Sequence, residues 1–127
     1  MTAISQYYSQ CYFPGLVEER ESLREKILGF WNSIRDLFPF KPPVHYVIDF
    51  ALVERQRESG KEWEVVVLEL NPFNFSTSGC LFDWESEKDN DILEGKLTFE
   101  FRIRTAPIAH SLKNKVPPSW VPLLFSD

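Results

Sequence analysis

Apolar side chains recur at three- and four-residue steps between residues 16 and 38. This spacing places them on one face of an α-helix, because the face repeats about every 3.6 residues. The apolar stripe consists of Leu23, Ile27, Trp31 (or Phe30), Ile34 and Phe38. Pro39, Pro42 and Pro43 follow, and proline cannot continue a helix. The pattern predicts one long helix over residues 16–38 that packs this stripe against the core.

Three further segments have the composition of β-strands. Residues 44–54 and 62–70 are rich in Val, Ile, Phe and Tyr, and residues 58–61 between them are typical of a turn. We therefore expect an antiparallel hairpin. Apolar and polar side chains alternate over residues 97–104, which predicts a half-buried strand. The chain should have an α+β fold, in which the hairpin and this third strand form one antiparallel sheet packed on the long helix.

The predicted hairpin carries polar side chains on one face. A turn centred near residue 59 or 60 places Asp49 opposite Glu69 or Leu70. Asn71 lies two residues beyond Glu69 and points to the same face. With Glu69 as the partner, the three side chains gather at roughly 5 Å between Cβ atoms. The other residues expected on this face are Val47, Ala51, Val65 and Val67. The opposite face should be core, with Tyr46, Ile48, Phe50, Leu52, Val66, Leu68 and Leu70.

Two carboxylates opposed in this way repel each other by about 3 kcal/mol at an effective dielectric constant of about 20. A hard divalent cation removes that repulsion. Mg²⁺ takes one or two carboxylates and fills its other positions with water and phosphate oxygens. The amide oxygen of Asn71 suits the same ion. We therefore predict Asp49, Glu69 and Asn71 as Mg²⁺ ligands; the alternative is that the three groups simply face water.

Composition narrows the possible functions. The chain has 127 residues, which suits a single domain over residues 1–127. The net charge of −5 argues against general nucleic-acid binding, which needs a basic surface. The first residues lack a basic start and an apolar run, and no apolar stretch approaches the roughly 20 residues of a membrane helix. We expect a cytoplasmic protein that binds no nucleic acid or membrane. Cys11 and Cys80 are expected as reduced thiols, with a disulfide left open.

Other polar residues give weaker indications. Arg102 could bind a nucleotide phosphate, or it could pair with Glu100 or face water. The acidic run over residues 83–94 has the ligand spacing of an EF-hand loop but lacks the required glycine, so we interpret it as a solvated acidic loop. His45 and His110 have no zinc-ligand spacing and are expected in structural or surface roles.

Several motifs together resemble a known family. The stretch over residues 69–73, with Asp49 on the preceding strand, resembles the metal-binding signature of ATP-grasp proteins. More narrowly, the chain resembles the C-terminal part of the cell division cycle protein 123 family. The stretches that carry this resemblance appear in the family's order: Ile4-Ser5-Gln6, Tyr46-Val47-Ile48-Asp49-Phe50, Leu68-Glu69-Leu70-Asn71-Pro72-Phe73, Leu81-Phe82-Asp83-Trp84-Glu85 and Phe101-Arg102.

The resemblance implies an ATP-grasp fold that binds ATP with Mg²⁺. The family's metal-binding aspartate, second acidic ligand and asparagine correspond to Asp49, Glu69 and Asn71. The second ligand is usually aspartate in the family, and here it is glutamate. The family's chain is longer, and its groups for adenine and phosphates lie upstream of the Ile-Ser-Gln stretch. We therefore expect this chain to hold the metal-binding half of the site, in a truncated or partial form of the family protein.

The same resemblance implies a role as an assembly chaperone for eukaryotic translation initiation factor 2, helping the gamma subunit join its partners. Two alternatives stay open. The first is an ATP-grasp ligase that activates a carboxylate as an acyl phosphate, although the sequence offers no acceptor site. The second is a nucleotide-free protein-interaction module, which would bind the gamma subunit without using Asp49 or Asn71.

Overall fold

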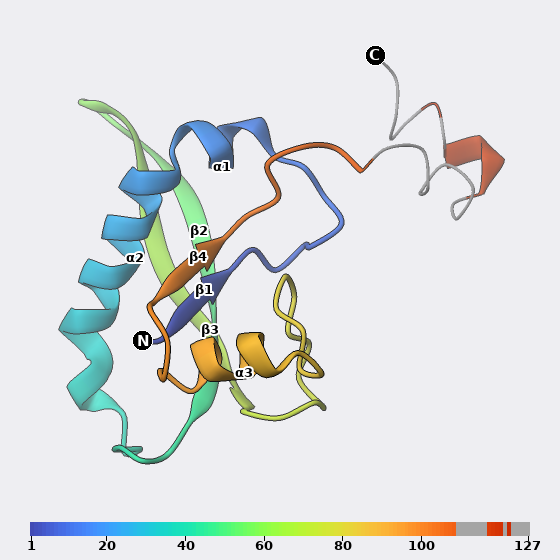
Figure 1. Ribbon diagram of the computed structural model, residues 1–127. Helices are drawn as coiled ribbons and strands as arrows, with labels where there is room; N and C mark the ends of the chain where they lie inside the picture. Colours follow the sequence, from blue (N-terminus) through green and yellow to red (C-terminus); the bar gives the residue numbers. More distant parts are fainter. Residues whose placement is uncertain (109–116, 121, 123–127) are drawn as a thin grey trace.

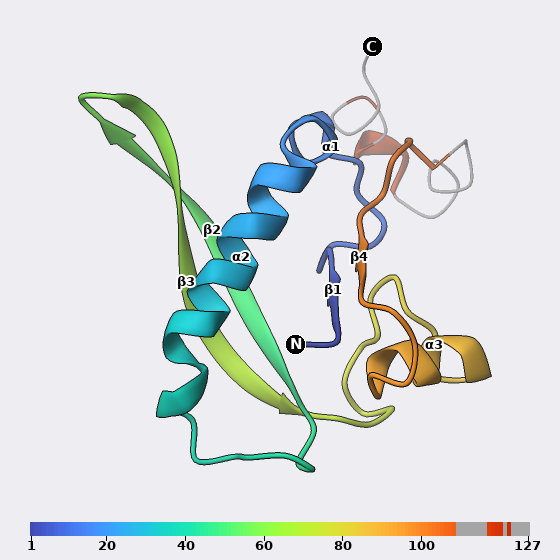
Figure 2. The ribbon, with the colours of Figure 1, turned by 60° about the vertical axis from the view of Figure 1, so that its left-hand side comes forward.

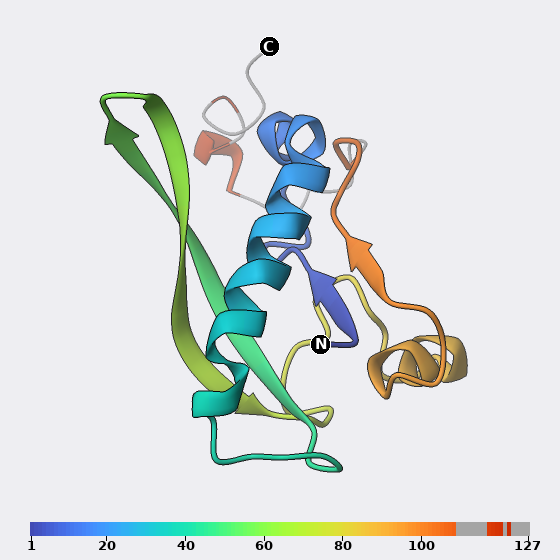
Figure 3. The ribbon, with the colours of Figure 1, turned by 90° about the vertical axis from the view of Figure 1, so that its left-hand side faces the viewer.

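The chain combines helices with two separate two-stranded sheets, which confirms the α+β class (Figure 1). The computed structural model describes residues 1–108, 117–120 and 122. Its strands are β1 (Ala3–Ser5), β2 (Tyr46–Arg57), β3 (Gly60–Pro72) and β4 (Glu100–Arg102). Figures 2 and 3 show the β2–β3 hairpin on one side of helix α2 (Arg20–Ile34) and the β1–β4 pair on the other.

The segment predicted as one long helix is divided into three pieces: α1 (Pro14–Glu18), α2 and the 3₁₀ turn η1 (Arg35–Leu37). The division falls at Glu19, where φ is −96° and ψ is 9°. Hydrogen bonding continues across it, because Leu23 N donates to Glu19 O at 2.9 Å. The predicted stripe is confirmed at its centre, where Leu23 and Ile27 are 1% and 5% exposed. The apolar spacing thus predicted the buried face of the helix, but it could not predict the change in backbone conformation at Glu19 that divides it.

The hairpin is confirmed, and its strands run closer to the turn than predicted. Gly60 follows the turn with φ of +113°, a conformation that side chains with a Cβ rarely adopt. The register shifts once: Asp49 pairs with Glu69, but the next residue, Phe50, pairs with Val67. Leu68 is therefore an extra residue on β3, which is a β-bulge.

The bulge overturns the predicted core face of the second strand. Alternation assigned Val66, Leu68 and Leu70 to the core. Instead, Val65 lies opposite Leu52 and is only 7% exposed, whereas the bulged Leu68 is 65% exposed. Leu70 keeps the predicted face, opposite Ile48, but is 40% exposed and so is not core. One extra residue changes which side chains face the helix, because side chains alternate with a period of two. An uninterrupted alternation had been assumed in the prediction, and that assumption was wrong.

The third predicted strand does not join the hairpin. β4 covers only Glu100–Arg102 and pairs in parallel with β1, so the prediction of one antiparallel sheet is wrong. Alternating polarity indicates that a segment is a strand with one buried face, but it does not identify the neighbour. Here the neighbour lies about one hundred positions earlier in the chain, with Ile4 opposite Phe101.

The acidic run was also misinterpreted as a solvated loop. It contains helix α3 (Glu87–Leu93), which begins after Ser86, whose hydroxyl accepts a hydrogen bond from Asp89 N. Ile92 is 1% exposed and Asp89 is 8% exposed, so the helix contributes to the core. The remaining element is the 3₁₀ turn η2 (Pro118–Trp120), and His110 lies outside the described residues. No helix in the described part of the chain is long and apolar enough to cross a membrane.

Candidate functional site

The predicted acidic pair forms on the hairpin. The register places Asp49 directly opposite Glu69, which settles the choice between Glu69 and Leu70. Val47 lies opposite Asn71. Directly opposed residues share a face, so Asp49, Glu69 and Asn71 gather on one side of the two strands. We call these three residues the polar triad.

The bulge decides which way the triad points. Before it, Val65 and Val67 lie on the same face as Leu52 and Phe50, which is the face that meets α2 through the Phe30–Phe50 ring contact at 6.0 Å. After it, Glu69 and Asn71 lie on the other face. β3 can therefore present valines to the helix and polar side chains away from it, although all of them occupy odd positions in the sequence.

Asn71 links the two carboxylates. Its amide nitrogen donates to Asp49 Oδ2 at 3.1 Å and lies 3.4 Å from Glu69 Oε1. One neutral donor thus serves two anionic acceptors. A rotation of about 180° about the last side-chain bond would exchange the amide nitrogen for the oxygen and turn Asn71 from a donor into a third oxygen ligand.

The neighbouring groups disturb the ionisation of Asp49. Burial raises the pKa of Asp49 above its ordinary value, and the neighbouring Glu69 raises it further, by hydrogen bonding and by charge. The Asn71 amide acts in the opposite direction and lowers the Asp49 pKa. The net increase means that the folded protein disfavours the ionised form of Asp49. A positive charge placed between the carboxylates would remove this penalty.

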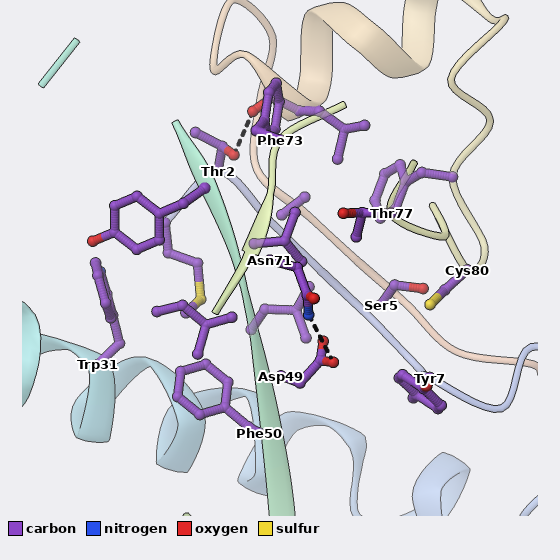
Figure 4. Close-up of a pocket in the computed structure, with 18 of the residues that line it drawn as sticks. Thr2, Ser5, Tyr7, Trp31, Asp49, Phe50, Asn71, Phe73, Thr77 and Cys80 are labelled. Atoms are coloured by element: carbon purple, nitrogen blue, oxygen red, sulfur yellow. Dashed lines mark hydrogen bonds between the residues drawn. The ribbon is translucent and has the colours of Figure 1, made fainter. Parts of the chain in front are cut away.

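The triad faces a cleft of about 1410 Å³ whose walls come from both sheets. Asp49 and Asn71 point into it from the hairpin (Figure 4). The labelled residues that share this cleft are Thr2, Ser5, Tyr7, Trp31, Phe50, Phe73, Thr77 and Cys80. Among these, the polar side chains carry hydroxyls and one thiol, and they come from residues 2–7 and from the loop that follows β3.

The β1 side of the cleft is held by two neighbouring polar residues. Ser5 Oγ accepts a hydrogen bond from Leu81 N at 3.0 Å, which ties β1 to the loop. The Gln6 side chain is 8% exposed, and both ends of its amide form hydrogen bonds. Its nitrogen donates to Tyr8 O and Cys11 O at 2.6 Å each. Its oxygen accepts from Arg104 N at 3.0 Å. Only the resemblance, through Ile4-Ser5-Gln6, pointed to these residues; composition gave no signal for them.

The loop after β3 has little conformational freedom. Thr77 Oγ1 donates to Pro72 O at 2.6 Å, and Trp84 Nε1 donates to Thr77 O at 2.7 Å. A Cβ on Gly79 would lie 2.3 Å from Phe82 O, so only glycine fits there. Cys80 follows with φ of 58°. Burial raises the Cys80 pKa, and the Asp49 charge adds to that rise while a hydrogen bond with Ser78 opposes it, which keeps the thiol neutral beside the triad.

A family model described as D123 matches residues 1–122. The chain belongs to the D123 family. This confirms the resemblance to the cell division cycle protein 123 family found in the sequence. Comparisons with curated proteins and with solved structures found no match for this D123 chain.

Arg102, the fourth residue predicted to contact a nucleotide, lies away from the triad of the D123 chain. Its guanidinium forms a bidentate ion pair with Asp89, with both N–O distances at 2.8 Å. Its Nε donates to Glu100 Oε2 at 2.7 Å, and the group lies 4.0 Å from the centre of the Phe82 ring. These contacts occupy the donors that a phosphate would need. The structural role of Asp89 was missed, because an acidic run gives no sign of which carboxylate is buried.

The triad has the donor set of a magnesium site. Within residues 1–108, 117–120 and 122, no three His, Cys, Asp or Glu side chains lie close enough to hold a metal ion. A site made only from such side chains, as structural zinc favours, does not occur in that part of the chain. Two carboxylates and one amide suit Mg²⁺, which keeps several positions for water and phosphate oxygens. The donors present therefore fit the predicted ion.

Proposed function

We propose that this D123-family chain carries the Mg²⁺-binding part of an ATP site of the ATP-grasp type, with Asp49, Glu69 and Asn71 as metal ligands. The observation that carries the proposal is the direct opposition of Asp49 and Glu69 across the ladder, with Asn71 bonded to both, at the wall of a large cleft. Mg²⁺ would neutralise the pair and present open positions to the phosphate oxygens of ATP.

The proposed role is binding rather than catalysis. The cleft offers hydroxyls from residues 2–7 and from the loop after β3, and the sequence offers no acceptor site for an acyl phosphate. We propose that Mg·ATP stabilises the arrangement of the two cleft walls, and that the protein serves in this form as a cytoplasmic assembly chaperone for translation initiation factor 2. The gamma subunit of that factor is the partner implied by the family resemblance.

One observation favours the nucleotide-free interaction module as the second candidate. Arg102, the cation expected to bind phosphate, is bound to Asp89 instead. The two candidates differ in what they require of the triad. Replacing Asp49 and Asn71 by alanine should abolish gamma-subunit binding that depends on Mg·ATP, but it should leave the binding of a nucleotide-free module unchanged.

The test is a thermal-shift titration with Mg²⁺, with and without ATP. At about 100 times the dissociation constant, specific binding should stabilise the protein by about 2.7 kcal/mol. The Asp49→Ala/Asn71→Ala variant should lose this shift. The matched control is Gln56→Ala/Glu58→Ala, which removes an amide and a carboxylate from the exposed end of the same hairpin. The proposal fails if wild type shows no shift that needs both ligands, or if the triad variant keeps it.

A further inference from the structure

Within the described residues, the outer edge of β4 is not paired with another strand. Gln6 N donates to Arg102 O at 3.0 Å, so the backbone groups of Arg102 face β1. Successive residues of a strand direct these groups to opposite sides, so those of Phe101 face away from β1. The Phe101 carbonyl accepts a hydrogen bond from Arg20 Nη2 at 2.7 Å. Among the described residues, the Phe101 N–H has no such partner.

A hollow of about 790 Å³ lies between this edge and the start of α2. One side is formed by Arg20, Glu21 and Arg24 of the helix. The other side is formed by Leu81 and by residues 99–103 and 105, which include the whole of β4. The hollow therefore runs along a strand edge, which is the geometry that an added strand needs.

The helix side of the hollow has an excess of positive charge, although the whole chain carries −5. Arg20 and Arg24 share one carboxylate, that of Glu21, at N–O distances of 3.9 and 4.0 Å. Such long, exposed ion pairs contribute little, so the guanidinium groups can exchange partners at low cost. Each also lies over an aromatic ring of the β4 segment, at 5.7 Å from the Phe101 centroid and 5.2 Å from the Phe99 centroid.

We propose that this hollow binds an extended acidic segment of a partner protein, which adds to the outer edge of β4 as a further strand. The segment would accept a hydrogen bond from the Phe101 N–H and donate one to the Phe101 carbonyl. Arg20 would leave that carbonyl and, together with Arg24, bind acidic side chains of the segment. In the free protein Arg20 covers the edge, which hinders pairing with strands that carry no matching charge. This proposal is independent of the metal site.

The experiment measures binding of fluorescein-labelled peptides of about eight residues, a usual strand length, by fluorescence anisotropy. The acidic probe alternates Glu and Val; a second peptide replaces Glu with Lys; a third is acidic but N-methylated at every residue, so neither of its edges can donate to a ladder. We expect the acidic probe alone to bind. Its binding should weaken as salt is added, because the arginine contacts are exposed.

Two arginine pairs provide the matched comparison. Arg20→Ala/Arg24→Ala should weaken binding of the acidic probe about tenfold or more, as expected when charge contacts worth about 1.4 kcal/mol are lost. Arg55→Ala/Arg57→Ala removes the same charge from the exposed end of the hairpin, where both arginines also pair with glutamates, and should leave the affinity unchanged. Arg24→Glu, which keeps the Arg20–Phe101 bond, serves as a second variant and should also weaken binding.

A backbone measurement separates strand addition from loose charge attraction. Binding should slow hydrogen exchange at the Phe101 N–H in wild type, because that group gains an acceptor. The proposal is overturned if the acidic probe does not bind, if the N-methylated peptide binds equally well, or if the two arginine pairs have equal effects. Binding should persist in the Asp49→Ala/Asn71→Ala variant, so failure of the metal site and failure of this surface are distinguishable.

Discussion

The carboxylate of Asp49 lies directly across the β2–β3 ladder from that of Glu69, at the last residue pair before the register shifts. The bulged residue Leu68 follows at once on the β3 side. The polar triad and the bulge are therefore parts of one feature. The ladder changes register where the chain changes from packing against a helix to lining a cleft.

Deleting Leu68 should leave the metal site in place. Leu68 is the unpaired residue of β3, so without it Glu69 follows Val67 directly, Asp49 stays opposite Glu69, and Asn71 stays on the same face. We expect the Mg²⁺-dependent thermal shift to persist in the deletion variant. Leu68→Ala keeps the residue count and alters a side chain that is 65% exposed, so it should also keep the shift. Loss of the shift on deletion alone would show that the local bend of the bulge, and not only the register, positions the triad.

Asp49→Asn should stabilise the protein in buffer without Mg²⁺. The folded-state pKa of Asp49 lies above its ordinary value of 3.8, so the folded protein binds this proton more tightly than the unfolded chain does. Wild type should therefore lose stability as pH rises from 3.8 through the folded-state pKa, and the variant should lack that loss. We expect a gain of about 1 kcal/mol at neutral pH, the scale of a partly solvated charge interaction. The midpoints of urea unfolding, taken at pH values across this range, measure the gain in stability. If Asp49→Asn is less stable than wild type at neutral pH, ionised Asp49 does not destabilise the folded protein.

Breaking the ion pair between Asp89 and Arg102 should have the opposite pH dependence. The hydrogen bonds from Arg102 hold the pKa of Asp89 below its ordinary value of 3.8, against the effect of burial. The pair therefore stabilises the fold above pH 3.8, and this contribution disappears as pH falls through the lowered pKa. Asp89→Asn should cost about 3 kcal/mol at neutral pH, because it leaves a largely buried guanidinium without its bidentate partner.

The control for that substitution lies on the same helix. Asp91 pairs with Lys96 at 3.3 Å in an exposed position, so Asp91→Asn should change the free energy of unfolding by less than about 0.5 kcal/mol. Both variants are compared by urea unfolding at neutral and acidic pH. Equal costs for the two substitutions would show that Asp89 has no special role in joining α3 to β4.

Two glycines provide a paired test of backbone space. Gly79→Ala places a Cβ 2.3 Å from Phe82 O, so the loop must shift, and we expect a loss of about 1–3 kcal/mol. Gly29→Ala lies in α2 with nothing within 4 Å of the added Cβ. That change should stabilise the protein by about 0.5–1 kcal/mol through helix propensity. Thermal unfolding of both variants measures these effects. If Gly79→Ala leaves the stability unchanged, the loop after β3 is not held rigidly at Gly79.

Local sequence signals predicted the parts of the fold that depend on near neighbours. The turn at residues 58–61 located the hairpin and narrowed the partner of Asp49 to Glu69 or Leu70; the observed pairing with Glu69 depends also on the bulge at Leu68. Helical spacing identified Leu23 and Ile27 as buried. A turn and a helix face are set within a few residues, so pattern alone suffices to find them.

The parts that failed depend on distant contacts or on a single residue's conformation. β4 pairs with β1, and nothing near residue 100 in the sequence indicates residue 4 as its neighbour. For Arg102, a phosphate contact, a pair with Glu100 and exposure to water were weighed; it pairs with Glu100 and also with Asp89, from a helix that the acidic composition concealed. Leu68 gave no sign of being the bulged residue, because a leucine suits either face of a strand. The role of the triad in metal binding stays a prediction.

The position of Leu68 also bears on how related genes are compared. Because Leu68 is unpaired, an in-frame loss of its codon would leave Asp49 opposite Glu69 and would keep Asn71 on the same face. A relative can therefore have one residue fewer between the hairpin turn and Glu69 and still possess the whole site. A gap of one residue there in an alignment is no sign that the ligands have moved apart.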